Sequence, residues 1–232
     1  FKGLLMGLFF MAVGMSIDLH RFLAAPVTLV GLTVLLMAVK IGVLAGLGRE
    51  QLRKVAVDES LSLCPQALEA AIQADLAAGR RPCAVIVTTG TTATTAVDPI
   101  EPIAALARRY GLWLHVDAAM GGSAQLLPEC RWMWEGIEGA DSVVVNPHKW
   151  LGAVFDCSLY YVRDPQHLVR VMSTNPSYLQ TAADGQVRTY RDWGVPLGRR
   201  FRALKLWFLL RLEGVEALKA RLRRDLENAR WL

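Results

Sequence analysis

Two residues that could do chemistry come at the ends of apolar, strand-like runs: Asp117 in "LWLHVDAA" and Lys149 in "DSVVVNPHKW". A carboxylate at such a position needs a cation or hydrogen-bond donors, because burying an unpaired charge is costly. An amine that loses hydration there favours its neutral form, which is a nucleophile for carbonyl groups. Each residue also has an ordinary interpretation, with Asp117 capping the next segment, Lys149 as a strand-end lysine and His148 as a loop histidine.

Taken together, the carboxylate and the lysine match the needs of one cofactor. Pyridoxal phosphate requires a lysine that forms a Schiff base, and an acid that keeps its pyridine nitrogen protonated so that the ring accepts electrons. The hydroxyl-rich "TTGTTATT" (88–95), which ends another apolar run, adds hydrogen-bonding groups. This combination of residues predicts a pyridoxal 5'-phosphate site.

The elements that must position these residues alternate between helical and strand-like patterns. Helical spacing covers 64–79, 98–111, 201–213 and 214–230, and short apolar runs rich in β-branched residues cover 83–90, 112–119, 141–150 and 158–164. Asp98 is placed to cap the second helix, with Pro99 in its first turn. The alternation predicts an α/β layered domain with a mainly parallel sheet, whose ligands collect beyond the carboxyl ends of the strands.

Residues 1–48 have a different composition, since Lys2, Asp18, Arg21 and Lys40 are their only Asp, Glu, Lys or Arg residues. The run that follows Arg21, extended past Lys40, is long enough to span a bilayer. We therefore predict a transmembrane-like helical hairpin over 1–46. The alternatives are a pair of buried core helices and, for Asp18, an intramembrane carboxylate in place of a polar loop.

The other 184 residues carry 23 basic and 20 acidic side chains, a balance that gives no reason to expect a nucleic-acid partner. The basic "RLRRDLENAR" (221–230) is interpreted as a solvated helix face. Four widely spaced cysteines, without CxxC or Cys/His pairing, predict no metal site and no disulfide framework. They indicate a reducing, cytoplasmic location for this part of the chain.

Residues 47–232 resemble the pyridoxal-phosphate-dependent group II amino-acid decarboxylases, in particular the aromatic-L-amino-acid branch. The resemblance rests on "VTTGTTATTAVDPI", "LWLHVDAAMGGSA", "ADSVVVNPHKWLGAVFDCS" and "YRDWGVPLGRRFRALKLWFLLR". It implies a partial large domain of a fold-type I pyridoxal-phosphate enzyme, with helices on both faces of the sheet. It also implies a carboxy-lyase that converts an L-amino acid, aromatic in this branch, to the amine and carbon dioxide, and a homodimer with shared active sites.

The same resemblance implies a role for each site residue. Lys149 would form the Schiff base with the cofactor, and Asp117 would pair with the pyridinium nitrogen, with Asp98 supporting the same electrostatic arrangement. Contacts with the cofactor, its phosphate or the substrate are implied for a further set of residues: Thr92, His115, Asn146 and His148.

Residues 173–185 resemble the mobile catalytic loop of the family, which reaches into the neighbouring subunit's site. Tyr178 matches the tyrosine that protonates the former α-carbon after carbon dioxide leaves. Related aldehyde synthases have phenylalanine at this position, so Tyr178 favours plain decarboxylation.

The N-terminal "FKGLLMGLFFMAVGMSIDL" resembles a transmembrane stretch of monovalent cation–proton antiporters of the glutathione-gated potassium-efflux type. It stands where the decarboxylases have a phosphate-binding loop and a ring-stacking histidine, and the chain stops before their C-terminal small domain. We therefore expect a chimera or fragment, associated with a membrane if residues 1–46 are expressed. The alternatives are an antiporter fragment fused to an inactive decarboxylase piece, and an α/β binding domain that has lost catalysis.

Overall fold

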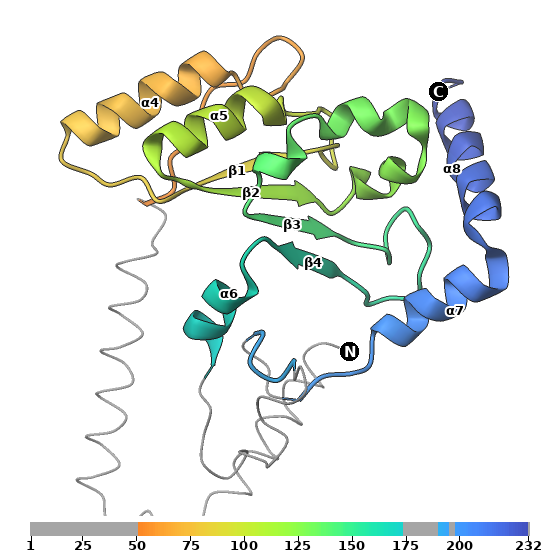
Figure 1. Cartoon of the computed structure of the whole chain (residues 1–232). Coiled ribbons are helices and arrows are strands. Elements are labelled where there is room, and N and C mark those ends of the chain that lie inside the picture. The colour runs from red at the N-terminus through yellow and green to blue at the C-terminus, as the bar shows by residue number, and fades with distance from the viewer. Residues whose placement is uncertain (1–50, 174–189, 195–197, 232) are drawn as a thin grey trace, which may run out of the picture. The chain divides into compact units, whose positions relative to one another are not determined.

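The computed structural model describes residues 51–173, 190–194 and 198–231 (Figure 1). The chain divides into two compact units, Phe1–Lys54 and Val55–Leu232, and the fold described below belongs to the second. The hairpin predicted over 1–46 lies outside the described residues, as does nearly all of the predicted loop over 173–185. Among the described helices, none has both the length and the apolar character that crossing a bilayer requires.

A four-stranded sheet forms the centre of this unit, with the strands in chain order: β1 (Ala84–Thr88), β2 (Trp113–Ala118), β3 (Ser142–Val145) and β4 (Leu159–Val162). β1 pairs with β2 and β2 with β3 in parallel, whereas β3 and β4 are antiparallel. The sheet is therefore mixed, with the predicted parallel pairing in two of its three ladders. The connection between β3 and β4 contains turns and no helix, so the chain returns directly rather than crossing over.

Five described helices surround the sheet: α4 (Pro65–Ala77), α5 (Ile100–Tyr110), α6 (Pro165–Met172), α7 (Ala203–Glu213) and α8 (Val215–Ala229). Short 3-10 helices η2 (Gly121–Leu126), η3 (Pro128–Trp134) and η4 (Ile137–Gly139) lie between β2 and β3. Gly214, with φ of +77°, separates α7 from α8 as predicted. In Figure 1, α4 and α5 cover one face of the sheet, while α6 lies on the other side.

The main hydrophobic core lies between the sheet and the helices α4 and α5. Alternate residues of β2, Leu114 and Val116, are fully buried there against α5 residues such as Ile103. Burying each such side chain stabilises the fold by about 1.5–3 kcal/mol. The other face of β2 carries Trp113, His115 and Asp117, which are only half-buried, so the pleat directs the polar residues of "LWLHVDAA" away from the core.

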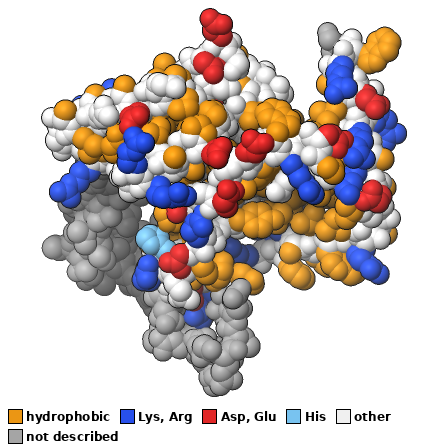
Figure 2. All heavy atoms as spheres, turned by 45° about the horizontal axis from the view of Figure 1, so that its top comes forward, with side chains coloured by type: hydrophobic (Ala, Val, Ile, Leu, Met, Phe, Trp, Pro, Cys, Tyr) orange, Lys and Arg blue, Asp and Glu red, His pale blue; other side chains and the backbone are white. Residues whose placement is uncertain are grey.

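A second hydrophobic cluster joins α8 to the segment that follows Lys149. Leu218 and Leu222 of α8 pack with Leu127 and Leu151, and all four are buried. This packing places the apolar side of the predicted solvated segment 221–230 against the domain. Acidic and basic side chains are interspersed over the face shown in Figure 2, in keeping with the near balance of charge.

The prediction that Asp98 caps α5 is wrong. The N-cap position belongs to Pro99, and no side chain caps the helix. The Asp98 carboxylate instead accepts hydrogen bonds from the backbone N–H groups of Leu63 and Thr88, each at 2.7 Å. The Asp98 carboxylate therefore makes tertiary hydrogen bonds, which join the start of α4 to the end of β1, in place of the predicted helix cap.

Candidate active site

Three chain segments meet at the carboxyl edge of the parallel strands. In the sheet register, Thr88 of β1 lies beside Asp117 of β2, which lies beside Val144 of β3. The segment 89–92 therefore leaves the sheet close to Asp117, and so does the segment 146–149. The structure confirms the expectation that these strand ends share one edge.

Glycines allow the segments that follow β1 and β2 to approach each other. A Cβ atom on Gly121 would lie 2.4 Å from the carbonyl oxygen of Thr89, which is far inside van der Waals contact. Gly90 adopts φ of +78°, and its own Cβ would lie 3.0 Å from the Cα of Gly121. Any larger residue at position 121 would force the two backbones apart.

We expect Gly121→Ala to destabilise the domain by about 1–3 kcal/mol, because the added methyl group meets backbone atoms that cannot rotate away. Urea unfolding followed by circular dichroism measures the change. Gly198→Ala is the matched control, since a Cβ at Gly198 meets nothing within 4 Å. Equal stability of the two variants would contradict the close approach.

Asp117 keeps one carboxylate oxygen available. Its Oδ1 accepts a hydrogen bond from the backbone N–H of Ala119 at 3.0 Å, while Oδ2 has no hydrogen bond within the described residues. The alternative role as a helix cap does not apply to η2, whose N-cap position is Met120. The local turn therefore orients the carboxylate and leaves Oδ2 for a cationic or hydrogen-bonding partner.

Lys149 lies in a turn whose backbone is fixed while its amine is not. Its N–H donates to the carbonyl of Asn146 at 2.9 Å, and the next two residues are anchored by α8, since Trp150 Nε1 donates to Asp225 at 3.0 Å and Leu151 is buried. The Lys149 side chain is exposed and has no hydrogen bond or ion pair within the described residues. The described residues therefore do not remove water from the Lys149 amine. A bound ligand would have to cause the loss of hydration that we predicted for this amine.

His148 is held by a short segment that precedes β4. Its Nδ1 lies 2.6 Å from the carbonyl oxygen of Cys157 and 3.1 Å from the N–H of the same residue, so either tautomer finds a partner. Its ring also meets the edge of Phe155, with centroids 4.9 Å apart. These contacts occupy Nδ1, whereas Nε2 has no hydrogen bond within the part of the chain that the structure describes.

This segment consists of residues 155–157, and we call it the strap. It is bound by one residue in the first turn of α7 and by the residue just before that helix. Arg202 donates to the Asp156 carboxylate from Nε at 3.0 Å, and its Nη2 lies 2.9 Å from the same oxygen. Lys205 donates from Nζ to the carbonyl of Phe155 at 2.9 Å. The strap thus links α7 to His148, the neighbour of Lys149.

The hydrogen bond from Arg202 is the main cause that lowers the pKa of Asp156 from 3.8 to about 2. Because the folded-state pKa lies below the unfolded value, the stabilisation is complete above pH 3.8 and is lost as the pH falls through about 2. We expect Asp156→Asn to lower stability at pH 7 and to flatten the acid limb of stability measured by urea unfolding between pH 5 and 2.

The matched control for the strap is Glu129→Gln, which removes another carboxylate whose pKa is lowered to about 2 by hydrogen bonding to Arg223. Both variants should flatten the acid limb, but only Asp156→Asn should shift the ring signals of His148 in NMR spectra. Unchanged His148 signals in the Asp156 variant would show that the strap does not position the histidine.

The remaining predicted residues in the described part of the chain differ in the hydrogen bonds and burial of their side chains. His115 Nδ1 lies 2.8 Å from Ser142 Oγ, and burial lowers the pKa of His115 below 6.5, with the charge of Asp117 acting in the opposite direction. Thr92 lies exposed on the turn after β1. The buried Oδ1 atom of Asn146 has no hydrogen-bond partner among the described residues, so it can accept a hydrogen bond from a bound group.

The profile of the pyridoxal-dependent decarboxylase conserved domain matches residues 10–232. This chain belongs to the pyridoxal-dependent decarboxylase family. It is 48% identical over 178 residues to an aromatic-L-amino-acid decarboxylase of Drosophila lebanonensis, covering 77% of this chain and 44% of the relative. It is 44% identical to tryptophan decarboxylase TDC1 of Camptotheca acuminata, covering 75% and 35% of the two chains.

Solved structures of the decarboxylase family resemble the domain as well. The crystal structure of Oryza sativa TDC with PLP and tryptamine has a TM-score of 0.70 and 43% identity, covering 72% of this chain and 35% of that one. The crystal structure of mouse CSAD has a TM-score of 0.74 and 37% identity, covering 80% and 39%. The chain therefore spans less than half the length of these relatives.

The decarboxylase match begins at residue 10 and so includes most of the segment that we likened to an antiporter. The antiporter resemblance is not supported, and neither is the transmembrane or membrane-associated character predicted from the apolar composition of residues 1–46. The domain boundary between residues 46 and 47, and the chimeric origin, stay predictions.

Of the residues predicted for the decarboxylase site, those at one sheet edge are Thr92, Asp117, Asn146, His148 and Lys149. Asp98 has both carboxylate oxygens bound to backbone N–H groups, one of them at the end of β1, and the electrostatic role implied for it stays a prediction. Tyr178 lies outside the described residues.

Sequence reasoning missed Ser142 and Asp156, since a serine before "VVV" and an aspartate in a loop carry no local signal of their partners.

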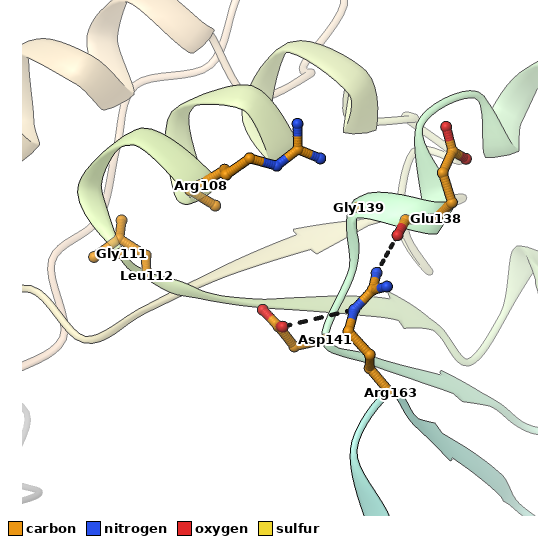
Figure 3. Close-up of a pocket in the computed structure, with 8 residues that line it drawn as sticks. Arg108, Gly111, Leu112, Glu138, Gly139, Asp141 and Arg163 are labelled. Atoms are coloured by element: carbon orange, nitrogen blue, oxygen red, sulfur yellow. Dashed lines mark hydrogen bonds and ion pairs between the residues drawn. The ribbon is translucent and has the colours of Figure 1, made fainter.

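A cavity of about 310 Å³ lies at the opposite edge of the sheet from these predicted residues, where β2 and β3 begin (Figure 3). Arg163 reaches across it to the carbonyl of Glu138, and its Nε lies 3.9 Å from an Asp141 oxygen. The guanidinium of Arg163 is thus already used by the protein. This cavity is separate from the residues that carry the predicted chemistry.

Proposed function

We propose that this chain carries the catalytic lysine and aspartate for pyridoxal-phosphate-dependent decarboxylation of an L-amino acid, yielding the amine and carbon dioxide. The observation that carries the proposal is the placement of Asp117 on β2 and of Lys149 in the turn that follows the neighbouring parallel strand β3. Within the described residues, Asp117 Oδ2 and the Lys149 amine have no hydrogen bond or ion pair. The aromatic substrate class is supported by relatives described as aromatic-L-amino-acid and tryptophan decarboxylases.

The described residues fit pyridoxal phosphate chemically. The edge offers a carboxylate oxygen, a primary amine and the side-chain amide of Asn146, which can donate from Nδ2 to a phosphate oxygen and can accept at its buried Oδ1. A polar cofactor with a phosphate, a ring nitrogen and a carbonyl group could use these groups together. The described ranges contain no group of three or more His, Cys, Asp or Glu side chains that could hold a metal ion.

When bound, pyridoxal phosphate supplies a ring that accepts the electrons released as carbon dioxide leaves. Asp117 would hold a proton at the ring nitrogen, and Lys149 would hold the cofactor through its amine. Asn146 and Thr92 would contact the polar groups of the cofactor. His148 and His115 would line the site, and Tyr178 would return a proton to the α-carbon of the substrate.

The proposal includes a homodimer in which residues 173–185 reach the site of the second copy. A cytoplasmic location stays a prediction.

A direct test incubates the purified chain with pyridoxal phosphate and L-tryptophan, L-tyrosine or D-tryptophan, and measures amine and carbon dioxide. Amine from the L-isomers alone supports the proposal, whereas cofactor binding without carbon dioxide release would favour a binding domain that has lost catalysis.

Aldehyde formation is a second candidate, because the chain is also 44% identical over 191 residues to a phenylacetaldehyde synthase of Arabidopsis thaliana. Tyr178 decides between the two in our proposal. We expect the wild-type chain to release amine. In air-saturated buffer, Tyr178→Phe should release a larger share of aldehyde and ammonia, with dissolved dioxygen as the oxidant that is reduced to hydrogen peroxide, as quantified by mass spectrometry and a peroxidase assay. Tyr190→Phe, which changes another tyrosine, should leave the product ratio unchanged, and an equal ratio in all three chains would remove Tyr178 from the mechanism.

A further inference from the structure

A chain of hydrogen bonds links three side chains on the half-buried face of the sheet. Trp113 Nε1 lies 2.9 Å from Ser142 Oγ, and His115 Nδ1 lies 2.8 Å from the same oxygen. The sheet register explains the meeting, because His115 of β2 pairs directly with Ser142 of β3, and Trp113 is two residues earlier on the same face. Ser142 is 2% exposed, so water has little access to its hydroxyl group.

The chemistry of the three groups determines where the protons lie. An indole nitrogen can only donate, so Ser142 accepts from Trp113. If His115 Nδ1 also donated, the buried Ser142 O–H would be left without an acceptor among the described residues, at a cost of about 1–3 kcal/mol. Ser142 therefore donates to His115 Nδ1, and the proton of the neutral imidazole is on Nε2.

The surroundings favour this neutral form and fix the ring. Burial lowers the pKa of His115, and the opposing effect of Asp117 is smaller. The Trp113 ring lies against His167 of α6, with centroids 5.4 Å apart, and the Tyr160 ring lies 6.2 Å from His115. Both ends of the hydrogen-bonded chain are thus held by neighbouring elements.

We propose that Trp113 and Ser142 are positioning residues that hold His115 as the Nε2–H tautomer, so that the site beside Asp117 offers a hydrogen-bond donor to an oxygen of the bound cofactor or substrate. His115 and Asp117 lie two residues apart on the same face of β2, and Nε2 has no hydrogen bond within the described residues. The proton assignment stands on the protein alone, and only the identity of the acceptor rests on the proposed function. His115 in this state cannot accept a proton at Nε2, which assigns it a role as donor and not as base.

The proton assignment is tested without cofactor by long-range proton–nitrogen NMR of the imidazole groups at pH 8, with His115 assigned from a His115→Gln spectrum. We expect nitrogen shifts of the Nε2–H tautomer, with Nδ1 as the unprotonated nitrogen. A protonated Nδ1 in the wild-type chain would overturn the proposal directly, whether or not the chain decarboxylates any substrate.

Variants then test whether Ser142 is responsible. Ser142→Ala should give averaged nitrogen shifts typical of mixed tautomers, and Ser142→Thr should restore the wild-type pattern because it keeps the hydroxyl group. Ser62→Ala is the matched control, since Ser62 is also buried but donates to the carbonyl of Val97. A wild-type pattern in Ser142→Ala would show that another group sets the tautomer.

The effect of the tautomer on function is tested by measuring the binding of pyridoxal phosphate, followed by its visible absorbance. Ser142→Ala should weaken binding or lower kcat/KM by about two- to tenfold, the effect of one misplaced neutral hydrogen bond, while Ser142→Thr should not. If the tautomer shifts and neither quantity changes, the donor role is wrong. If the wild-type chain binds no cofactor, the proposed function fails while the proton assignment keeps its own test.

Discussion

Lys149→Ala should abolish borohydride-trappable labelling by pyridoxal phosphate and lower amine formation by about a thousandfold or more. The amine of Lys149 is the group that would hold the cofactor covalently, and no other side chain in the proposed site supplies a primary amine. Removing a covalent catalytic group typically eliminates most of the rate enhancement, with the remainder coming from binding alone. Peptide mass spectrometry after borohydride treatment locates the label, and a coupled assay measures the amine.

Lys219→Ala is the control for Lys149, because Lys219 lies on α8 and pairs with Glu216 at 2.7 Å. It should keep both the label and the activity. Lys149→Arg separates charge from nucleophilicity, since a guanidinium keeps the positive charge but does not form a stable Schiff base. Stoichiometric label on the Lys149→Ala chain, or full activity of Lys149→Arg, would exclude this lysine as the covalent group.

Asp117→Asn should reduce amine formation by about a hundred- to a thousandfold and leave the fold nearly unchanged. The amide can still accept the hydrogen bond that Ala119 donates at 3.0 Å, so the local turn persists. It cannot supply the negative charge that would keep the ring nitrogen protonated. Steady-state kinetics, together with the absorbance maximum of the bound cofactor, measure the two consequences.

Asp98→Asn is the informative comparison, because it alters a carboxylate in the neighbouring β1 connection that serves the backbone. Asp98 accepts from two backbone N–H groups at 2.7 Å each, so an amide there would lose one bond and cost about 1–3 kcal/mol in stability. We expect this variant to lose stability and keep the cofactor spectrum. If instead it changed the spectrum as Asp117→Asn does, Asp98 would belong to the electrostatic arrangement after all.

The prediction of strands and helices succeeded where local patterns are strong. The apolar runs around 83–90 and 112–119 became β1 and β2, and the helical patterns on either side of Gly214 became α7 and α8. The antiparallel pairing of β4 was not predicted, because a run such as "SLYYVRD" has the same period in either direction. The cap assigned to Asp98 failed because two distant N–H groups compete for its carboxylate more effectively than the helix does.

The residue types in the chain predicted the chemistry of the site: a carboxylate after one apolar run and a lysine after another, in motifs that resemble one family. The groups that support these two residues could be found only in the three-dimensional fold. Ser142 meets His115 because β2 and β3 pair in one register, and Arg202 meets Asp156 although the two lie far apart in the chain. Local periodicity records the environment of each residue, whereas strand register and helix packing depend on the summed burial of many distant side chains, which no short stretch of sequence contains.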